Sequence, residues 1–156
     1  MLFRSEGGMT GFDRQETKLP TYWNTPFSKI CLGMKIGLQP VRFSVMNVHA
    51  NSLHSLIASG GYHNTSYGPE NWKTLIGSEA SLQTDCYREG FNVIPDSSNS
   101  KARIGIVGAQ GNPCWWYRSS RIGFGTGGRP DDSSSCGNED SRGGKHLKAM
   151  GYIFVQ

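Results

Sequence analysis

One segment near the end of the chain, residues 121–139, restricts the possible fold more than any other. It reads RIGFGTGGRPDDSSSCGNE and holds five glycines, one proline, three acidic residues and one cysteine. Glycine and proline at this density disfavour both a helix and an ordinary strand. We therefore expect a surface loop that a disulfide, a metal ion or both hold in place.

Composition favours a small protein built from short strands and long loops. The 156 residues are enough for one domain with a sizeable core. Only 36% are apolar, while 21 are glycine and seven are proline, a balance that favours strands and loops over helices. No stretch approaches the roughly 20 apolar residues of a membrane-spanning helix. Residues 1–8 lack the apolar core of a signal peptide, so we expect the chain to be part of a longer one.

Apolar runs along the chain predict several strands. These runs span residues 29–36, 41–48, 72–76, 101–107 and 152–155. The first two form a predicted hairpin, because a short segment with glycine and proline joins them. Residues 52–58 are too few for periodicity to distinguish a strand from a short helix. An apolar strand that ends the chain must be buried, so we expect the last one to lie inside a sheet rather than at its edge.

Oxygen-bearing side chains crowd the glycine-rich segment and its end. They belong to Asp131, Asp132, Asn138, Glu139 and Asp140. Calcium takes about six to eight oxygen ligands, including backbone carbonyls, and tolerates irregular geometry. The spacing does not match an EF-hand loop. From these residues alone, a calcium site and a solvated acidic loop without an ion are equally supported.

Three successive aromatic residues, Trp115, Trp116 and Tyr117, follow Cys114. In a loop they serve either as core anchors or as a stacking platform for a ligand such as a sugar ring. Neighbouring side chains of an extended segment point in opposite directions. We therefore expect one of them to pack inward and Trp116 to be the more exposed.

Cysteine usage and one short motif favour a secreted protein. The four cysteines, at positions 31, 86, 114 and 136, fit neither a CxxC metal site nor a dense disulfide scaffold. They suit a moderately bridged extracellular domain. Asn64, followed by Thr65 and Ser66, is a glycosylation acceptor. We therefore expect an extracellular glycoprotein.

Motifs for catalysis and for nucleic-acid binding are missing. Residues 104–111 resemble the start of a dinucleotide-binding unit, but Gln110 stands where a glycine is needed and Pro113 blocks the following helix. The histidines form no HExxH or Cys/His cluster, and no nucleophile elbow is present. The net charge is +4, yet no basic helix or recognition motif accompanies it. We expect neither an enzyme nor a nucleic-acid-binding protein.

Several strings together resemble the C-terminal half of fibrinogen-related domains. They are ETKLPTYWNTPF at residues 16–27, ICLGMK at 30–35, RIGFGTGG at 121–128 with the following DD and CGNE, and KAMGYIFV at 148–155. The resemblance covers most of the chain. It is closest to cnidarian members of the family, including skeletal organic matrix proteins of corals, and extends more distantly to intelectins.

The resemblance implies an α+β fold of the fibrinogen C-terminal type. Such a fold has a twisted antiparallel sheet with its last strand in the centre, short helices and a long, loop-rich calcium-binding subdomain. Residues 1–156 would form a single partial domain without the usual N-terminal subdomain. A disulfide between Cys86 and Cys114 is also implied, with Cys136 either free or paired with Cys31.

The resemblance also implies positions for ligands. By position, the calcium (Ca2+) ligands are expected at Asp131, Asp132, Asn138 and Asp140. The ligand-binding residues are expected at Trp115, Trp116, Tyr117 and Ser119. Intelectins carry an Asn and a His as ligands just ahead of the glycines, where this chain has residues 117–120 (YRSS).

The sequence thus predicts a secreted, lectin-like recognition domain that binds calcium and carbohydrate and catalyses no reaction. Its expected partners are glycans or extracellular matrix proteins, with no nucleic acid and no membrane span, and its oligomeric state is left open. The alternative is a structural or protein-interaction domain of an extracellular, mineralising matrix, without sugar binding.

Overall fold

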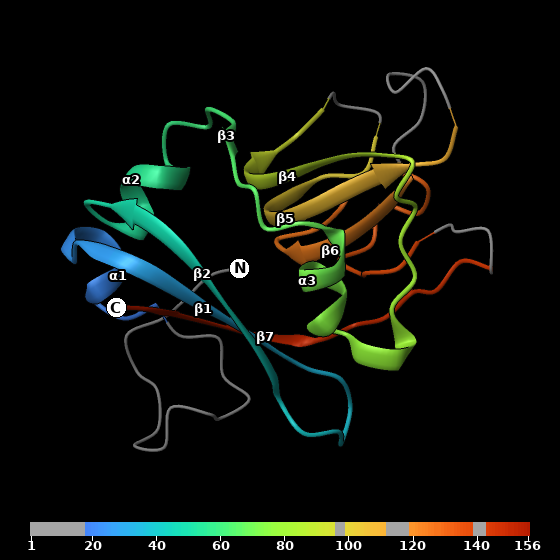
Figure 1. Ribbon diagram of the computed structural model, residues 1–156, viewed down its shortest axis with the longest axis horizontal. Helices are drawn as coiled ribbons and strands as arrows, with labels where there is room; N and C mark the ends of the chain where they lie inside the picture. Colours follow the sequence, from blue (N-terminus) through green and yellow to red (C-terminus); the bar gives the residue numbers. More distant parts are fainter. Residues whose placement is uncertain (1–17, 96–98, 112–118, 139–142) are drawn as a thin grey trace.

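Two antiparallel sheets form the framework of the protein (Figure 1). The computed structural model describes residues 18–95, 99–111, 119–138 and 143–156. One sheet has three strands in the order β2, β1, β7, and the other has four in the order β3, β4, β5, β6. The strands are β1 (Phe27–Lys35), β2 (Arg42–Ala50), β3 (His63–Asn64), β4 (Cys86–Val93), β5 (Ala102–Ala109), β6 (Ser120–Phe124) and β7 (Met150–Val155), and the helices are α1 (Thr21–Asn24), α2 (Leu53–Ile57), α3 (Pro69–Thr74) and the 3-10 helix η1 (Gly77–Glu79).

The architecture agrees with the predicted α+β class, since antiparallel strands dominate and the helices are few and short. The finer prediction of a fibrinogen C-terminal fold stays a prediction. None of the helices in the described residues is both long enough and apolar enough to cross a membrane.

The predicted hairpin of β1 and β2 is confirmed. The two strands are antiparallel, with Ile30 opposite Met46. Ile30, Leu32 and Met34 are at most 2% exposed, because alternate side chains of a strand share one face. Gly37 has a φ of 53° in the connection, a left-handed conformation that glycine adopts readily.

The last strand, β7, is at an edge of its sheet, so its predicted position inside a sheet is wrong. Among the described strands it pairs with β1 alone. Ile153 and Val155 nevertheless pack against the core. Burial of one face of the strand is therefore enough to hold an apolar segment at this edge.

Residues 72–76, predicted as a strand, are helical as far as Thr74. The helix α3 has Pro69 in its first turn, Glu70 near its N-terminus and Lys73 near its C-terminus, which are features that favour a helix. The side chains of Glu70 and Lys73 form an ion pair of 2.7 Å. Trp72 is fully buried, so tertiary packing overrides the strand propensity of this run.

The ambiguous run at residues 52–58 forms the helix α2. Ser52 precedes the helix, and its Oγ accepts a hydrogen bond from the Ser55 backbone N–H at 3.0 Å. Ser55 Oγ in turn accepts from the Ser52 backbone N–H at 3.1 Å. This reciprocal capping box satisfies two donors that a helix start leaves unpaired.

The segment at residues 121–139 is not a surface loop throughout, contrary to the prediction. Residues 121–124 belong to β6, in which every residue is buried, and residues 135–138 are buried as well. The strand forms because Gly123 lies opposite Gly105 of β5. A Cβ atom on Gly105 would lie 2.4 Å from the carbonyl oxygen of Ile122, so glycine is what lets the two backbones approach this closely.

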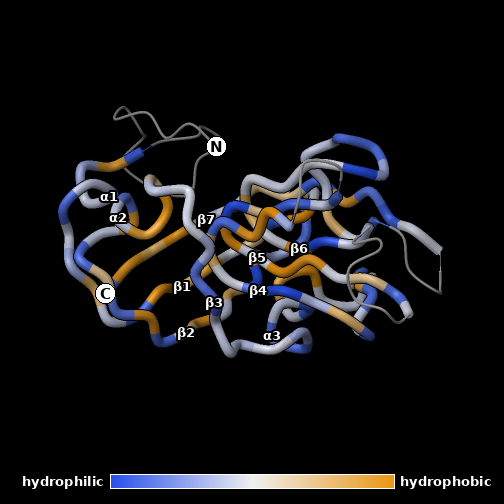
Figure 2. Tube along the Cα trace, turned by 90° about the horizontal axis from the view of Figure 1, so that it is seen from above, coloured by the Kyte–Doolittle hydropathy of each residue, from blue (hydrophilic) through white to orange (hydrophobic). Residues whose placement is uncertain are grey.

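One cluster of buried side chains joins the two sheets. It combines Ile30 and Leu32 of β1 with Ile104 of β5 and Ile122 of β6, and it includes Trp72 of α3. Figure 1 shows α3 between the two sheets, and Figure 2 shows apolar residues gathered in the strands. The two sheets therefore share a core.

The cysteines have different states. Cys86 is disulfide-bonded, whereas Cys31 and Cys136 are free thiols. Cys114 lies outside the described residues, so its pairing with Cys86 stays a prediction. The alternative pairing of Cys31 with Cys136 does not occur in this structure. Burial raises the pKa of the Cys136 thiol to about 11, so this group is protonated at neutral pH.

Replacing Gly105 tests the close approach of β5 and β6. Gly105→Ala is expected to lower the free energy of unfolding by about 1–3 kcal/mol, because the added methyl group forces the strands apart. Urea denaturation measures this quantity. Gly61→Ala is the matched control, since its Cβ would meet only Ser59 Oγ, at 3.5 Å, and should change stability by less than ~0.5 kcal/mol. An equal loss in both variants would contradict the interpretation.

Candidate functional site

A buried arginine organises the segment that carries the predicted calcium ligands. The Arg121 side chain is fully buried and makes six hydrogen-bond contacts with its five N–H groups, because the two Nη1 hydrogens are shared among three acceptors. Four of these reach the backbone carbonyl oxygens of residues 128, 129, 133 and 135, at 2.7–3.0 Å. The others reach Ser100 Oγ at 3.1 Å and Asp131 Oδ1 at 2.8 Å. Residues 128–135 therefore surround the positively charged guanidinium of Arg121.

Asp131 is the anion that pairs with this cation. Its Oδ2 accepts a hydrogen bond from Ser133 Oγ at 2.5 Å and lies 2.5 Å from His146 Nδ1. Partial burial raises the pKa of Asp131, but hydrogen bonds from Ser133, Arg121 and His146 outweigh it and hold the pKa well below its usual range. Both carboxylate oxygens are thus already bound by donors.

The described part of the predicted calcium set does not fit a calcium ion. Asp131 is neutralised by Arg121, and Asp132 is exposed to solvent. Asn138 is buried and turns its Nδ2 donor toward Asp131 Oδ1, at 3.2 Å. Its Oδ1 accepts no hydrogen bond from the described residues, but one such oxygen is far fewer than the roughly six that calcium needs.

The remaining member of that set, Asp140, lies outside the described residues. Among the residues that the structure does describe, no three or more His, Cys, Asp or Glu side chains form a group suited to a metal ion. A calcium site at this segment therefore stays a prediction.

The predicted ligand-binding residues are not assembled into an open site by the described chain. Trp115, Trp116 and Tyr117 lie outside the described residues. Ser119 is 7% exposed, and its Oγ donates to Gln83 Oε1 at 3.0 Å. The Ser119 hydroxyl is therefore engaged within the protein rather than presented to a ligand.

The pair of His146 and Asp131 resembles two thirds of a catalytic triad. A triad also needs a hydroxyl at the other imidazole nitrogen. Ser133 Oγ instead bonds to Asp131 and to Ser135 Oγ. Within the described ranges no hydroxyl bonds to His146 Nε2, so these residues do not assemble a nucleophile and its base.

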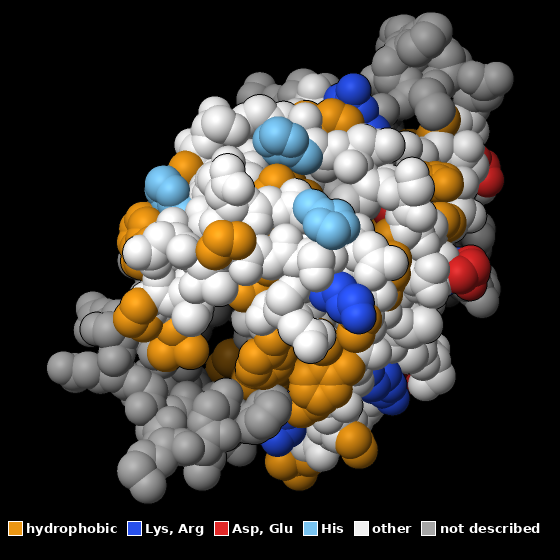
Figure 3. Space-filling model, turned by 60° about the vertical axis from the view of Figure 1, so that its left-hand side comes forward, with side chains coloured by type: hydrophobic (Ala, Val, Ile, Leu, Met, Phe, Trp, Pro, Cys, Tyr) orange, Lys and Arg blue, Asp and Glu red, His pale blue; other side chains and the backbone are white. Residues whose placement is uncertain are grey.

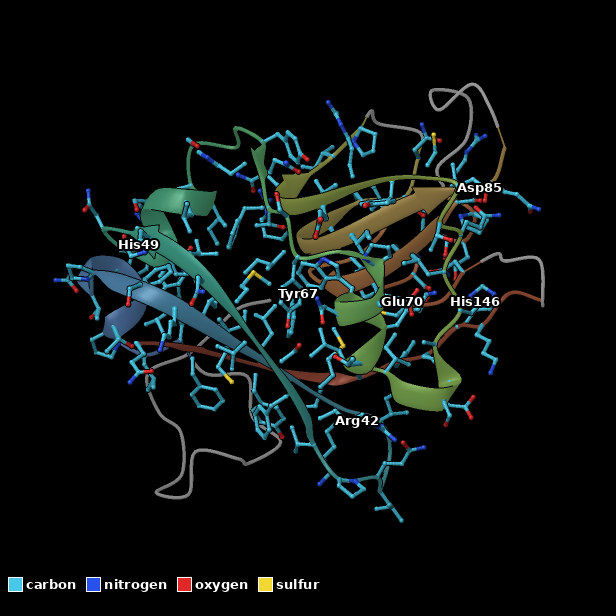
Figure 4. All side chains as sticks on the ribbon, viewed as in Figure 1. Arg42, His49, Tyr67, Glu70, Asp85 and His146 are labelled. Atoms are coloured by element: carbon cyan, nitrogen blue, oxygen red, sulfur yellow. The ribbon has the colours of Figure 1, made fainter. Side chains whose placement is uncertain are left out.

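A groove of about 650 Å³ lies between β2 of one sheet and β3 of the other. Apolar side chains line part of it, and two of these, Met46 and Phe91, are at most 5% exposed. Figure 4 shows Tyr67 between the sheets and His49 on β2, with His146 far from both. The polar lining consists of Asn47, His49, His63, Asn64, Thr65, Ser66 and Tyr67.

A buried glutamate fixes one wall of this groove, the segment at residues 63–67. Glu89 is 4% exposed and accepts hydrogen bonds from Trp72 Nε1 at 2.7 Å and from the Tyr67 backbone N–H at 3.1 Å. Tyr67 also contacts Ser44 of β2 through its hydroxyl group. Because the wall is held from both sheets, the groove is formed without a ligand.

A second hollow, of about 300 Å³, lies on the other side of this wall. Two partly exposed tyrosines line it, Tyr62 at 39% and Tyr87 at 43% exposure. Arg88 stacks on the Tyr62 ring, 4.8 Å from its centre. Asn64, the predicted glycosylation acceptor, is exposed and lines both hollows. Polar and aromatic groups therefore flank β3 on both sides.

Apart from Asn64, the groove residues were not predicted from the sequence. The one available signal is the density of Tyr, Asn, Thr and Ser at residues 62–67, which is also typical of an ordinary loop. A scan against protein-family models, a search of curated proteins and a search of solved structures each found no match. A function for the groove therefore has to be inferred from the chemistry of its lining residues.

Replacing Arg121 tests whether it holds its segment. Arg121→Met is expected to lower the free energy of unfolding by about 3–5 kcal/mol, because Asp131 and several carbonyl oxygens lose their donor. Arg129→Met removes an exposed arginine from the same segment and should change stability by less than ~0.5 kcal/mol. Chemical denaturation of both variants makes the comparison. Similar losses would show that the buried network is not what holds the segment.

Asp131 should make stability fall at acid pH. Its folded-state pKa is lowered from an unfolded value of about 3.9. Its stabilisation is therefore fully present above about pH 5 and is lost as the pH falls toward the folded pKa. The difference in unfolding free energy between wild type and Asp131→Asn should be constant above about pH 5 and shrink below it. A difference that stayed constant down to about pH 2 would count against the ion pair.

Proposed function

We propose that this protein is a non-catalytic recognition domain that binds an uncharged, polyhydroxylated ligand, a carbohydrate, in the groove between its two sheets. The observation that carries the proposal is the lining of the groove. Among the described lining residues there is no Asp, Glu, Lys or Arg, while amides, hydroxyls and imidazoles are abundant. Such groups exchange hydrogen bonds with sugar hydroxyls.

The apolar part of the lining matches the apolar C–H faces of a sugar ring. A pyranose has apolar C–H faces beside its hydroxyl groups, and a binding site for it combines apolar surface with a few placed polar groups. Phe91 and Met46 supply the apolar surface, and Asn47 and Asn64 supply donors and acceptors at the rim. The volume of about 650 Å³ lies within the usual range for ligand sites.

The resemblance to fibrinogen-related domains supports a recognition role and an extracellular location. Its calcium-dependent mode of sugar binding is not part of the proposal, because Asp131 accepts hydrogen bonds from both Arg121 and Asn138. The free thiol of Cys31 and the single disulfide-bonded cysteine among the described residues, Cys86, are compatible with either compartment. Extracellular location therefore rests on the resemblance and on the acceptor motif at Asn64.

Glycan binding by protein produced without glycosylation tests the proposal. Glycan-array screening should identify neutral sugars, and calorimetry should then show that Asn47→Ala weakens binding of the best one by about fivefold, the effect of one lost hydrogen bond. Asn24→Ala, an exposed asparagine outside the groove, is the matched control. Repeating the titration with calcium and with a chelator separates this groove from a calcium-dependent site.

Three outcomes would overturn the assignment. If no glycan is retained, the alternative of a structural or protein-interaction domain is favoured. If glycans bind but Asn47→Ala has no more effect than Asn24→Ala, the ligand occupies another part of the surface. Binding that a chelator abolishes would restore the calcium site as the place of recognition.

A further inference from the structure

A separate cleft lies where both ends of the described chain meet the four-stranded sheet. Its volume is about 370 Å³. A smaller hollow of about 210 Å³ adjoins it and shares four of its lining residues. These shared residues are Lys18, Tyr22, Leu53 and Ile153.

Most of the side chains that line this cleft are apolar, although polar atoms contribute the larger share of its surface. Ile104 of β5 and Phe124 of β6 line it at 2% and 4% exposure. Leu53 and Ile57 of α2 form another side, and Ile153 of β7 completes it. The adjoining hollow is lined mainly by apolar atoms, so an apolar part of a ligand that reaches into it would be removed from water, the main favourable term in such binding.

Three polar groups in the cleft are hydrogen-bond donors without a carboxylate partner in the described chain. The Lys18 ammonium lies 3.6 Å from the centre of the Tyr22 ring and 4.0 Å from that of Trp23, contacts that leave its N–H groups available. The Arg103 guanidinium bonds to a single described side chain, Asn92, through Nη1. Burial raises the pKa of the Tyr22 hydroxyl, which keeps it protonated as a donor.

The arginine is also oriented. Arg103 Nη1 donates to Asn92 Oδ1 at 2.7 Å. The Nδ2 of Asn92 is itself fixed, because it donates to the carbonyl oxygen of Gly61 at 2.8 Å and approaches those of Leu56 and Ile57 at 3.4 and 3.3 Å. An anion that meets Arg103 here finds a guanidinium already held in place, and less side-chain entropy is lost on binding.

A long stretch of the sequence that contributes to this cleft contains no acidic residue. No Asp or Glu occurs between Lys18 and Pro69, a stretch that also contains Lys29, Lys35 and Arg42. On the face shown in Figure 3, acidic side chains are nearly confined to one edge. This stretch of the chain therefore carries only positive formal charge, which favours an anion nearby.

We propose that this cleft binds a single-tailed apolar carboxylate, such as a medium-chain fatty acid. The carboxylate accepts hydrogen bonds from Lys18, Arg103 and Tyr22, and the alkyl chain lies against Ile104, Phe124 and Ile153. Charge complementarity selects the anionic head, and the apolar walls select the tail. This site shares no lining residue with the groove between β2 and β3.

Calorimetry with decanoate below its micellar concentration tests the proposal. One decanoate should bind per chain, and 1-decanol and acetate should each bind at least tenfold more weakly, because each lacks one of the two recognised parts. Arg103→Gln and Lys18→Gln should each weaken decanoate binding by about tenfold, the usual effect of losing a charge-assisted hydrogen bond.

A matched variant separates the site from general charge effects. Lys101→Gln removes an exposed cation that does not line the cleft, and its affinity for decanoate should stay within about twofold of wild type. Ala58→Leu fills part of the cleft and should weaken decanoate and decanol alike. The proposal is overturned if decanoate does not bind, if decanol binds as tightly, or if Arg103→Gln and Lys101→Gln have equal effects.

Discussion

The fold depends on a buried guanidinium that replaces water and solvent ions as the partner of backbone carbonyls. Four carbonyl oxygens and one carboxylate converge on Arg121, and without a donor each would be left partly unsatisfied next to the core. A buried charge is tolerated only when it is paired and hydrogen-bonded. Arg121 meets this condition, and it thereby lets a glycine-rich segment with few apolar side chains pack against β5 as an ordered strand and turn.

Structural features set by residues close together in the sequence could be predicted from it, whereas features set by contacts between distant residues could not. The hairpin of β1 and β2 was predictable because alternation and turn residues are local signals. The edge position of β7 was not, because it is decided by packing against distant segments. Nothing in the sequence near Arg121 marks it as buried, since its acceptors lie on residues that contact it only after folding.

The candidate sites also differ in how far the sequence predicted them. The acidic cluster at residues 131–140 was visible in the sequence, but Asp131 is engaged with Arg121 and His146, and Asp132 is exposed to solvent. The groove and the cleft were not visible, since each is lined by elements far apart along the chain. Their chemistries are complementary: the first has uncharged polar groups around an apolar surface, and the second has cations at the mouth of an apolar hollow.

The short helix α2 lies between the groove and the cleft and forms a partition between them. Leu56 lines the groove, whereas Leu53 and Ile57 line the cleft, and Asn92 fastens the end of the helix to Arg103. A ligand that shifts this partition from one side changes the shape of the other side. Thermodynamic linkage then requires each ligand to alter the affinity for the other by the same factor, so a helix of five residues would couple the cleft to the groove.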